Sequence, residues 1–192
     1  MNLFIVRHAS AGLRRANPLL DLKRPLDKEG KRHCLQLAHT LNNLNIQFDL
    51  IVSSPLKRSL QTASLLGTET GYEAEILLSS ALAPAATLPD FQKLLRSHQS
   101  CENLLVVGHD PNLTSFLGAL LVPLSAHSAA LVRLRKGSLA RVTLTRGPGV
   151  LQWMLDPRIV RSLYATSTKS SRRKTSKKKA SKPPKASKPS KK

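Results

Sequence analysis

The sequence predicts one α/β domain of three layers, in which helices cover both faces of a mostly parallel sheet. Short apolar runs alternate with stretches of helical periodicity through most of the 192-residue chain. This alternation is typical of βαβ units. Polar residues follow several of the apolar runs and lead directly into a helix. After Pro123 strand patterns follow one another, which predicts an antiparallel addition to the sheet.

The first half of the chain supplies two strand–helix pairs and a further strand. Strands are predicted over 2–6, 48–52 and 73–78, and helices over 28–43 and 55–67. Asp27 precedes the first helix as an N-cap. Ser54 is expected to cap the second helix, with Pro55 in its first turn and Gly67 at its end.

The second half begins with a helix over 88–96, a strongly apolar strand over 103–107 and a helix over 113–121. Three consecutive strands are then predicted over 131–134, 140–144 and 151–155. Turn residues at 136–138 and 147–149 separate them. The sheet should therefore be parallel in its first part and antiparallel near its end.

Composition excludes several classes of protein. The chain is long enough for a substantial core. It contains no stretch of about twenty apolar residues, so no membrane span is predicted. Arg7 and His8 interrupt the first apolar run too early for a signal peptide, so we expect a cytoplasmic protein. Cys34 and Cys101 lack metal-ligand spacing and are expected to be free thiols. We also expect a monomer.

The net charge of +20 is concentrated at the C-terminus. Residues 169–192 contain 12 of the 31 lysines and arginines and no acidic residue, and Lys-Ala-Ser-Lys-Pro occurs twice, at 179–183 and 185–189. Such a composition predicts a disordered tail over 165–192 after a domain over 1–164. The tail is interpreted either as a ligand for nucleic acid or polyphosphate or as a solvated segment without a dedicated partner.

Cationic and titratable residues follow three of the predicted strands. Arg7 and His8 end the first strand, Arg58 lies in the helix start after the second, and His109 ends the strand over 103–107. The carboxyl ends of parallel strands lie at one edge of a sheet. Two guanidiniums and two imidazoles at this edge suit a tetrahedral dianion such as a phosphoryl group. Gly108 is expected to let the backbone approach that ligand.

These segments resemble the histidine phosphatase superfamily, which has the phosphoglycerate mutase-like fold, and within it the short bacterial SixA-type phosphohistidine phosphatases. The resemblance spans residues 2 to about 157. It rests on Leu3-Phe4-Ile5-Val6-Arg7-His8-Ala9, Asp21-Leu22-Lys23-Arg24-Pro25-Leu26 with Gly30, Ser53-Ser54-Pro55-Leu56-Lys57-Arg58-Ser59-Leu60-Gln61-Thr62-Ala63, Val107-Gly108-His109-Asp110-Pro111 and Trp153-Met154-Leu155-Asp156-Pro157.

The resemblance implies a phosphatase that needs no metal or other cofactor. His8 would be the nucleophile and would form a phosphohistidine intermediate. Its attacking nitrogen must be unprotonated, so the other ring nitrogen should be fixed by a hydrogen bond to the backbone. Arg7, Arg58 and His109 would hold the phosphoryl oxygens and stabilise the transition state.

One departure from the family pattern bears on the substrate. Family members place an acidic residue after the third strand, whereas residues 79–86 contain no carboxylate. An alkoxide leaving group benefits by roughly two to four orders of magnitude from a proton donor, and a P–N bond is far more labile. We therefore expect a phosphohistidine-containing protein as substrate. Asp90 is a weak candidate for a substitute acid.

Two alternatives to this function stay open. One is a small-molecule phosphomonoesterase of the same fold. The other is a non-catalytic protein that binds polyanions through its basic tail.

Other residues have two interpretations each. Arg24 either lines the pocket mouth or ties its loop to Asp21 or Asp27, and the second is favoured. Arg14 and Arg15 either attract an acidic protein or are merely solvated. Asp110 either caps the following helix, the more ordinary role, or orients a catalytic side chain. The remaining histidines are expected to have packing or surface roles.

Overall fold

The computed structural model describes residues 1–122 and 132–165. Its six-stranded sheet has the order β3-β2-β4-β1-β5-β6. The strands are β1 (Asn2–Arg7), β2 (Leu50–Ser53), β3 (Leu77–Leu78), β4 (Asn103–Gly108), β5 (Leu139–Thr143) and β6 (Val150–Leu155). Strands β1 to β4 are parallel, and β5 pairs antiparallel with both β1 and β6. The predicted sheet class is confirmed.

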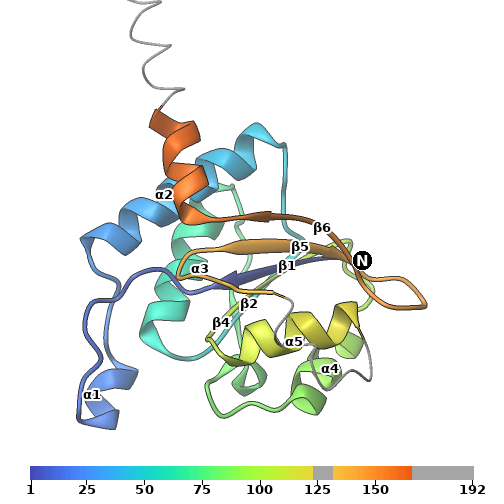
Figure 1. Ribbon diagram of the computed structural model, residues 1–192, viewed down its shortest axis with the longest axis horizontal. Helices are drawn as coiled ribbons and strands as arrows, with labels where there is room; N and C mark the ends of the chain where they lie inside the picture. The colour runs from blue at the N-terminus through green and yellow to red at the C-terminus, as the bar shows by residue number, and fades with distance from the viewer. Residues whose placement is uncertain (123–131, 166–192) are drawn as a thin grey trace, which may run out of the picture.

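Helices cover both faces of this sheet (Figure 1). One face packs against α4 (Leu88–Ser97) and α5 (Asn112–Leu121), and the other against α2 (Lys28–Asn43) and α3 (Lys57–Glu69). The strand period of two explains the division: Leu3 and Ile5 belong to the first core, and Phe4 and Val6 to the second. The three-layer α/β/α architecture is therefore confirmed.

Helix α2 begins and ends where the sequence predicts, and the side chain of Asp27 caps it by accepting from the Gly30 N–H. A Cβ on Gly30 would lie 2.0 Å from the Ser10 carbonyl oxygen. Only glycine allows the first turn of α2 to lie this close to the loop after β1. This contact places the loop that carries His8 against the helix.

The prediction for the second helix was wrong at both ends. Helix α3 begins at Lys57 after an N-cap at Leu56, and it continues through Gly67 to Glu69. Gly67 packs close to the Ile51 side chain, 3.1 Å from where its Cβ would lie. It therefore serves helix–sheet packing, and the positive φ of 76° that follows the helix belongs to Gly71.

Two strand predictions need correction. Only Leu77 and Leu78 of the predicted 73–78 strand pair with β2, at the edge of the sheet. Residues 132–134 of the predicted 131–134 strand are not in a strand, and residue 131 lies outside the described range. Two helices were also missed, α1 (Pro18–Leu22) and the helical residues 157–165 at the end of the described range. Helix α1 has five residues, too few for a clear apolar period.

The basic tail lies outside the described residues apart from residue 165, so its disorder and the domain boundary stay predictions. In the described ranges, no helix is long and apolar enough to cross a membrane. Cys34 and Cys101 are both free thiols.

Candidate active site

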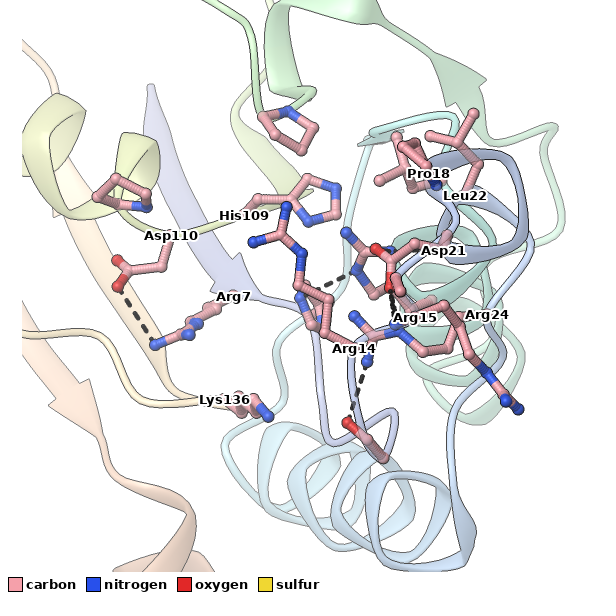
Figure 2. Close-up of a pocket in the computed structure, with 17 residues that line it drawn as sticks. Arg7, Arg14, Arg15, Pro18, Asp21, Leu22, Arg24, His109, Asp110 and Lys136 are labelled. Carbon is pink, nitrogen blue, oxygen red and sulfur yellow. Dashed lines mark hydrogen bonds and ion pairs between the residues drawn. The ribbon is translucent and has the colours of Figure 1, made fainter.

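The ends of three parallel strands lie side by side at one edge of the sheet. The His8 N–H donates to the Gly108 carbonyl over 3.0 Å, and the Ser54 N–H donates to the Val107 carbonyl over 2.9 Å. Arg7, His8, Arg58 and His109 consequently line one cavity of about 830 Å³. The convergence that the sequence predicts is present. Figure 2 shows this cavity, with Arg7 and Asp110 on one side and Asp21 and Arg24 on the other.

His8 has one ring nitrogen fixed by the backbone, while the other faces Arg58 in the pocket. Its Nδ1 lies 2.8 Å from the Ala9 carbonyl oxygen. Because a carbonyl can only accept, Nδ1 carries the proton and Nε2 keeps its lone pair. The predicted backbone hydrogen bond is thus present. Burial lowers the pKa of His8 to about 4, and the charges of Arg58 and Arg7 act in the same direction against the hydrogen bond to Ala9. His8 is therefore neutral near pH 7.

His109 lies beside His8, with 5.0 Å between the ring centroids. Its Nε2 is 2.9 Å from the Ser54 hydroxyl and 3.2 Å from the Ser59 hydroxyl. Burial, followed by the proximity of His8 and Arg58, lowers the pKa of His109 to about 3. The ring is neutral near pH 7, and its position between two hydroxyls holds it in place at the pocket wall.

Arg58 is buried and contacts both His8 and the loop opposite. Its Nε donates to His8 Nε2 over 3.3 Å. Its Nη1 donates to the backbone carbonyl of Asp21 over 3.0 Å and pairs with the Asp21 carboxylate over 3.3 Å. The guanidinium is thereby held with its Nε directed at the ring nitrogen that keeps its lone pair.

Arg7 is held by two acceptors on the opposite side of the pocket. Its Nη1 donates to the Leu134 carbonyl over 2.8 Å and pairs with the Asp110 carboxylate over 3.3 Å. Asp110 also accepts from the Thr114 hydroxyl. Helix α5 has Pro111 as its N-cap and no side-chain cap. The capping role predicted for Asp110 is therefore wrong, and its side chain orients Arg7 instead.

Arg24 has both of the roles that the sequence left open. Its Nε donates to Asp21 over 2.8 Å, and its Nη1 donates to the carbonyls of Ala11 and Gly12. These contacts tie the loop after β1, as predicted. Arg24 also lines the pocket, together with Arg14, Arg15 and Lys136. The rim of the pocket is therefore strongly basic.

Asp90 does not serve this pocket. Its carboxylate accepts from the backbone N–H and the hydroxyl of Thr87 in a capping box at the start of α4. These hydrogen bonds lower its pKa. Among the described residues that line the pocket, the carboxylates are Asp21 and Asp110, and each is paired with arginine.

Several residues of the site were not predicted in these roles. Asp21 holds Arg58, Ser54 and Ser59 hold His109, and Thr62 accepts from the Ala9 N–H over 3.2 Å. Ser54 was interpreted as a helix cap, whereas its hydroxyl faces His109. Gly108 was expected to make room for a ligand. A Cβ there would lie 2.9 Å from the Leu82 carbonyl, so Gly108 makes room for neighbouring backbone instead.

The two neutral imidazoles predict that stability falls in mild acid. Histidines in the unfolded chain take up protons below about pH 6.5, whereas folded His8 stays neutral down to about 4 and His109 to about 3. The unfolded state therefore binds more protons in this range. The contribution of these two imidazoles to the free energy of unfolding is therefore fully present above pH 6.5 and is lost as the pH falls.

We expect the free energy of unfolding to drop between pH 7 and about pH 5, by roughly 2 kcal/mol for each imidazole. Urea denaturation at the two pH values measures it. The variant His8→Asn/His109→Asn should lose most of this dependence. An equal drop in the variant and the wild type contradicts the assignment.

Comparison with known proteins agrees with this geometry. The model of the histidine phosphatase superfamily (branch 1) matches residues 3–83. An uncharacterized protein of Picosynechococcus is 31% identical over 146 residues, which cover 72% of this chain and 87% of that protein. The structure of the protein histidine phosphatase SixA complexed with tungstate matches with a TM-score of 0.71 and 26% identity, over 82% of this chain and 97% of that one.

The fold is also that of small-molecule phosphatases. The alpha-ribazole phosphatase from Shigella flexneri matches with a TM-score of 0.65 and 17% identity over 82% of this chain and 97% of that one. A mycobacterial glucosyl-3-phosphoglycerate phosphatase matches with a TM-score of 0.64 and 19% identity, over 79% of this chain and 96% of that one. Fold and pocket together define a protein of the phosphatase class. The chain belongs to the histidine phosphatase superfamily.

Proposed function

We propose that the protein hydrolyses phosphohistidine on another protein, with His8 as nucleophile. The Nε2 lone pair attacks phosphorus, and the P–N bond to the substrate imidazole breaks. The leaving imidazole takes its proton from solvent. Water then attacks the phosphorus on His8, so that inorganic phosphate is released and neutral His8 is restored. Arg7, Arg58 and His109 surround the phosphoryl oxygens and stabilise their charge.

One observation carries this choice of substrate: among the described residues, both carboxylates that line the pocket are held by arginines. Asp21 accepts from the Arg15 N–H and pairs with Arg24 and Arg58, which holds its pKa at about 2. Asp110 pairs with Arg7. With its pKa at about 2, Asp21 is a poor proton donor near pH 7. An alkoxide leaving group needs such a donor, whereas imidazole leaves as a stable neutral molecule once it takes up a proton.

The relatives support the same choice in part. SixA is named a protein histidine phosphatase, and its structure contains tungstate, a tetrahedral oxyanion with the shape of phosphate. The small-molecule phosphatases share the fold at lower identity. A phosphomonoesterase is therefore the second candidate, and the cavity volume also suits a small ester.

A substrate comparison distinguishes the two candidates. The purified protein is incubated with a phosphotransfer protein phosphorylated on histidine, and separately with sugar and nucleoside phosphates. We expect rapid release of phosphate from the phosphohistidine protein and brief accumulation of an acid-labile phosphoenzyme on His8. Fast turnover of the esters with none of the phosphohistidine protein overturns the proposal and favours the phosphomonoesterase.

A further inference from the structure

Four exposed leucines lie beside the mouth of the pocket. Leu13 is 90% exposed, Leu19 70%, Leu20 57% and Leu22 48%. They lie in the loop after β1 and in α1, and we call them together the α1 surface. None of the hydrophobic clusters formed by the described residues includes them. Single exposed leucines are ordinary, but four within ten residues concentrate exposed apolar area in these two segments, as is found at interaction sites.

The leucines do not hold α1 in place. Helix α1 buries none of its residues, and Asn17 caps it by accepting from the Leu19 N–H. Asp21 supplies its attachment, through the contacts with Arg15, Arg24 and Arg58 described above. Figure 1 shows α1 standing apart from the sheet. Folding of the helix therefore gives no reason for leucines at positions 19 and 20.

The α1 surface adjoins the basic rim of the pocket. Pro18, Asp21 and Leu22 of α1 line the pocket, and so do Arg14 and Arg15 of the preceding loop. Figure 2 shows Pro18 and Leu22 next to Asp21 at the pocket edge. A partner that covers the leucines while its phosphoryl group enters the pocket must also face both arginines. Charge complementarity then favours carboxylates near the phosphoryl group.

We propose that the α1 surface docks the protein substrate, by binding the part of its surface that carries the phosphohistidine between apolar and acidic side chains. This inference rests on the proposed function. It assigns Leu19 and Leu20 to recognition of the protein, while Arg7, His8, Arg58 and His109 contact the phosphoryl group itself. A free phosphohistidine molecule reaches the pocket without touching these two leucines.

The variant Leu19→Ser/Leu20→Ser tests the proposal with two substrates. The probes are a helical phosphotransfer protein phosphorylated on histidine and free phosphohistidine. For the protein, we expect KM to rise roughly ten- to hundred-fold with little change in kcat, since two apolar contacts are lost. For the free amino acid, kcat/KM stays at the wild-type value. The matched control is Leu44→Ser, which removes a leucine 51% exposed at the end of α2.

Other outcomes overturn the docking inference or the function separately. Equal kcat/KM for the protein in the double variant and the wild type overturns docking while leaving the function in place. Wild-type enzyme that hydrolyses esters but neither phosphohistidine probe overturns the proposed function. Loss of self-association in the double variant, measured by sedimentation, overturns docking and assigns the surface to a second copy. Loss of binding to anionic lipid vesicles overturns it in favour of a bilayer.

Discussion

Replacing His8 by Ala abolishes turnover: we expect kcat for phosphohistidine hydrolysis to fall by at least about three orders of magnitude. The reason is the arrangement of its ring. Nδ1 is committed to the Ala9 carbonyl, burial keeps the ring neutral, and Nε2 is left as the nucleophile. His109 lies beside it, with its Nε2 within hydrogen-bond distance of the Ser54 and Ser59 hydroxyls.

Two measurements check this result. Steady-state phosphate release gives kcat, and rapid acid-free quenching with a labelled phosphohistidine protein detects label on the enzyme. Wild type should carry label at early times and His8→Ala none. His98→Ala is the control, because His98 ends α4 outside the pocket. Full activity or labelling in His8→Ala would show that another residue is the nucleophile.

Removing the Arg58 side chain is expected to have the next largest effect. In Arg58→Ala, kcat/KM should fall by roughly two to three orders of magnitude, as for other groups that stabilise transition-state charge. Arg58 reaches His8 through Nε and is held by Asp21 through Nη1. Lysine keeps the charge but lacks the planar fork. Arg58→Lys should therefore recover only a minor part of the loss.

The variant Asp21→Asn tests how far the effect of Arg58 depends on its position as well as on its charge. Asp21→Asn keeps the shape of the side chain and weakens its hold on Arg58 and Arg24. We expect a smaller loss than in Arg58→Ala, mostly in kcat. The control for Arg58→Ala is Arg96→Ala, which also removes a positive charge, in the last turn of α4. Wild-type kinetics in Arg58→Ala would exclude the guanidinium from the transition state.

The local sequence pattern was sufficient to predict the long helices and strands and the residues that end them. Helix α2 has both its period and its cap in its own sixteen residues and the one before them. Strands β1 and β4 have continuous apolar runs because both faces are covered. His8 and His109 follow those runs directly. Their convergence was predictable because parallel strands end at one edge.

The errors lie where distant residues decide the outcome. Gly67 looked like the end of a helix, yet Ile51 packs against it and the helix continues. Ser54 looked like a cap, yet its hydroxyl faces His109, 55 residues away in sequence. Asp110 looked like a cap as well, and Arg7 pairs with it instead. Each residue had a satisfactory local role, so its own segment gave no sign of the distant partner.

By itself the sequence determined the three-layer fold, the edge of the sheet where the site lies, and the four side chains at its centre. These follow from apolar periodicity, which is a local property, and from the general rule that parallel strands of an open sheet end at one edge. The tertiary structure decided which carboxylates hold Arg7 and Arg58, and that α1 presents its leucines beside the pocket. Those features depend on side chains that meet only after the chain has folded, and no spacing along the sequence specifies such contacts.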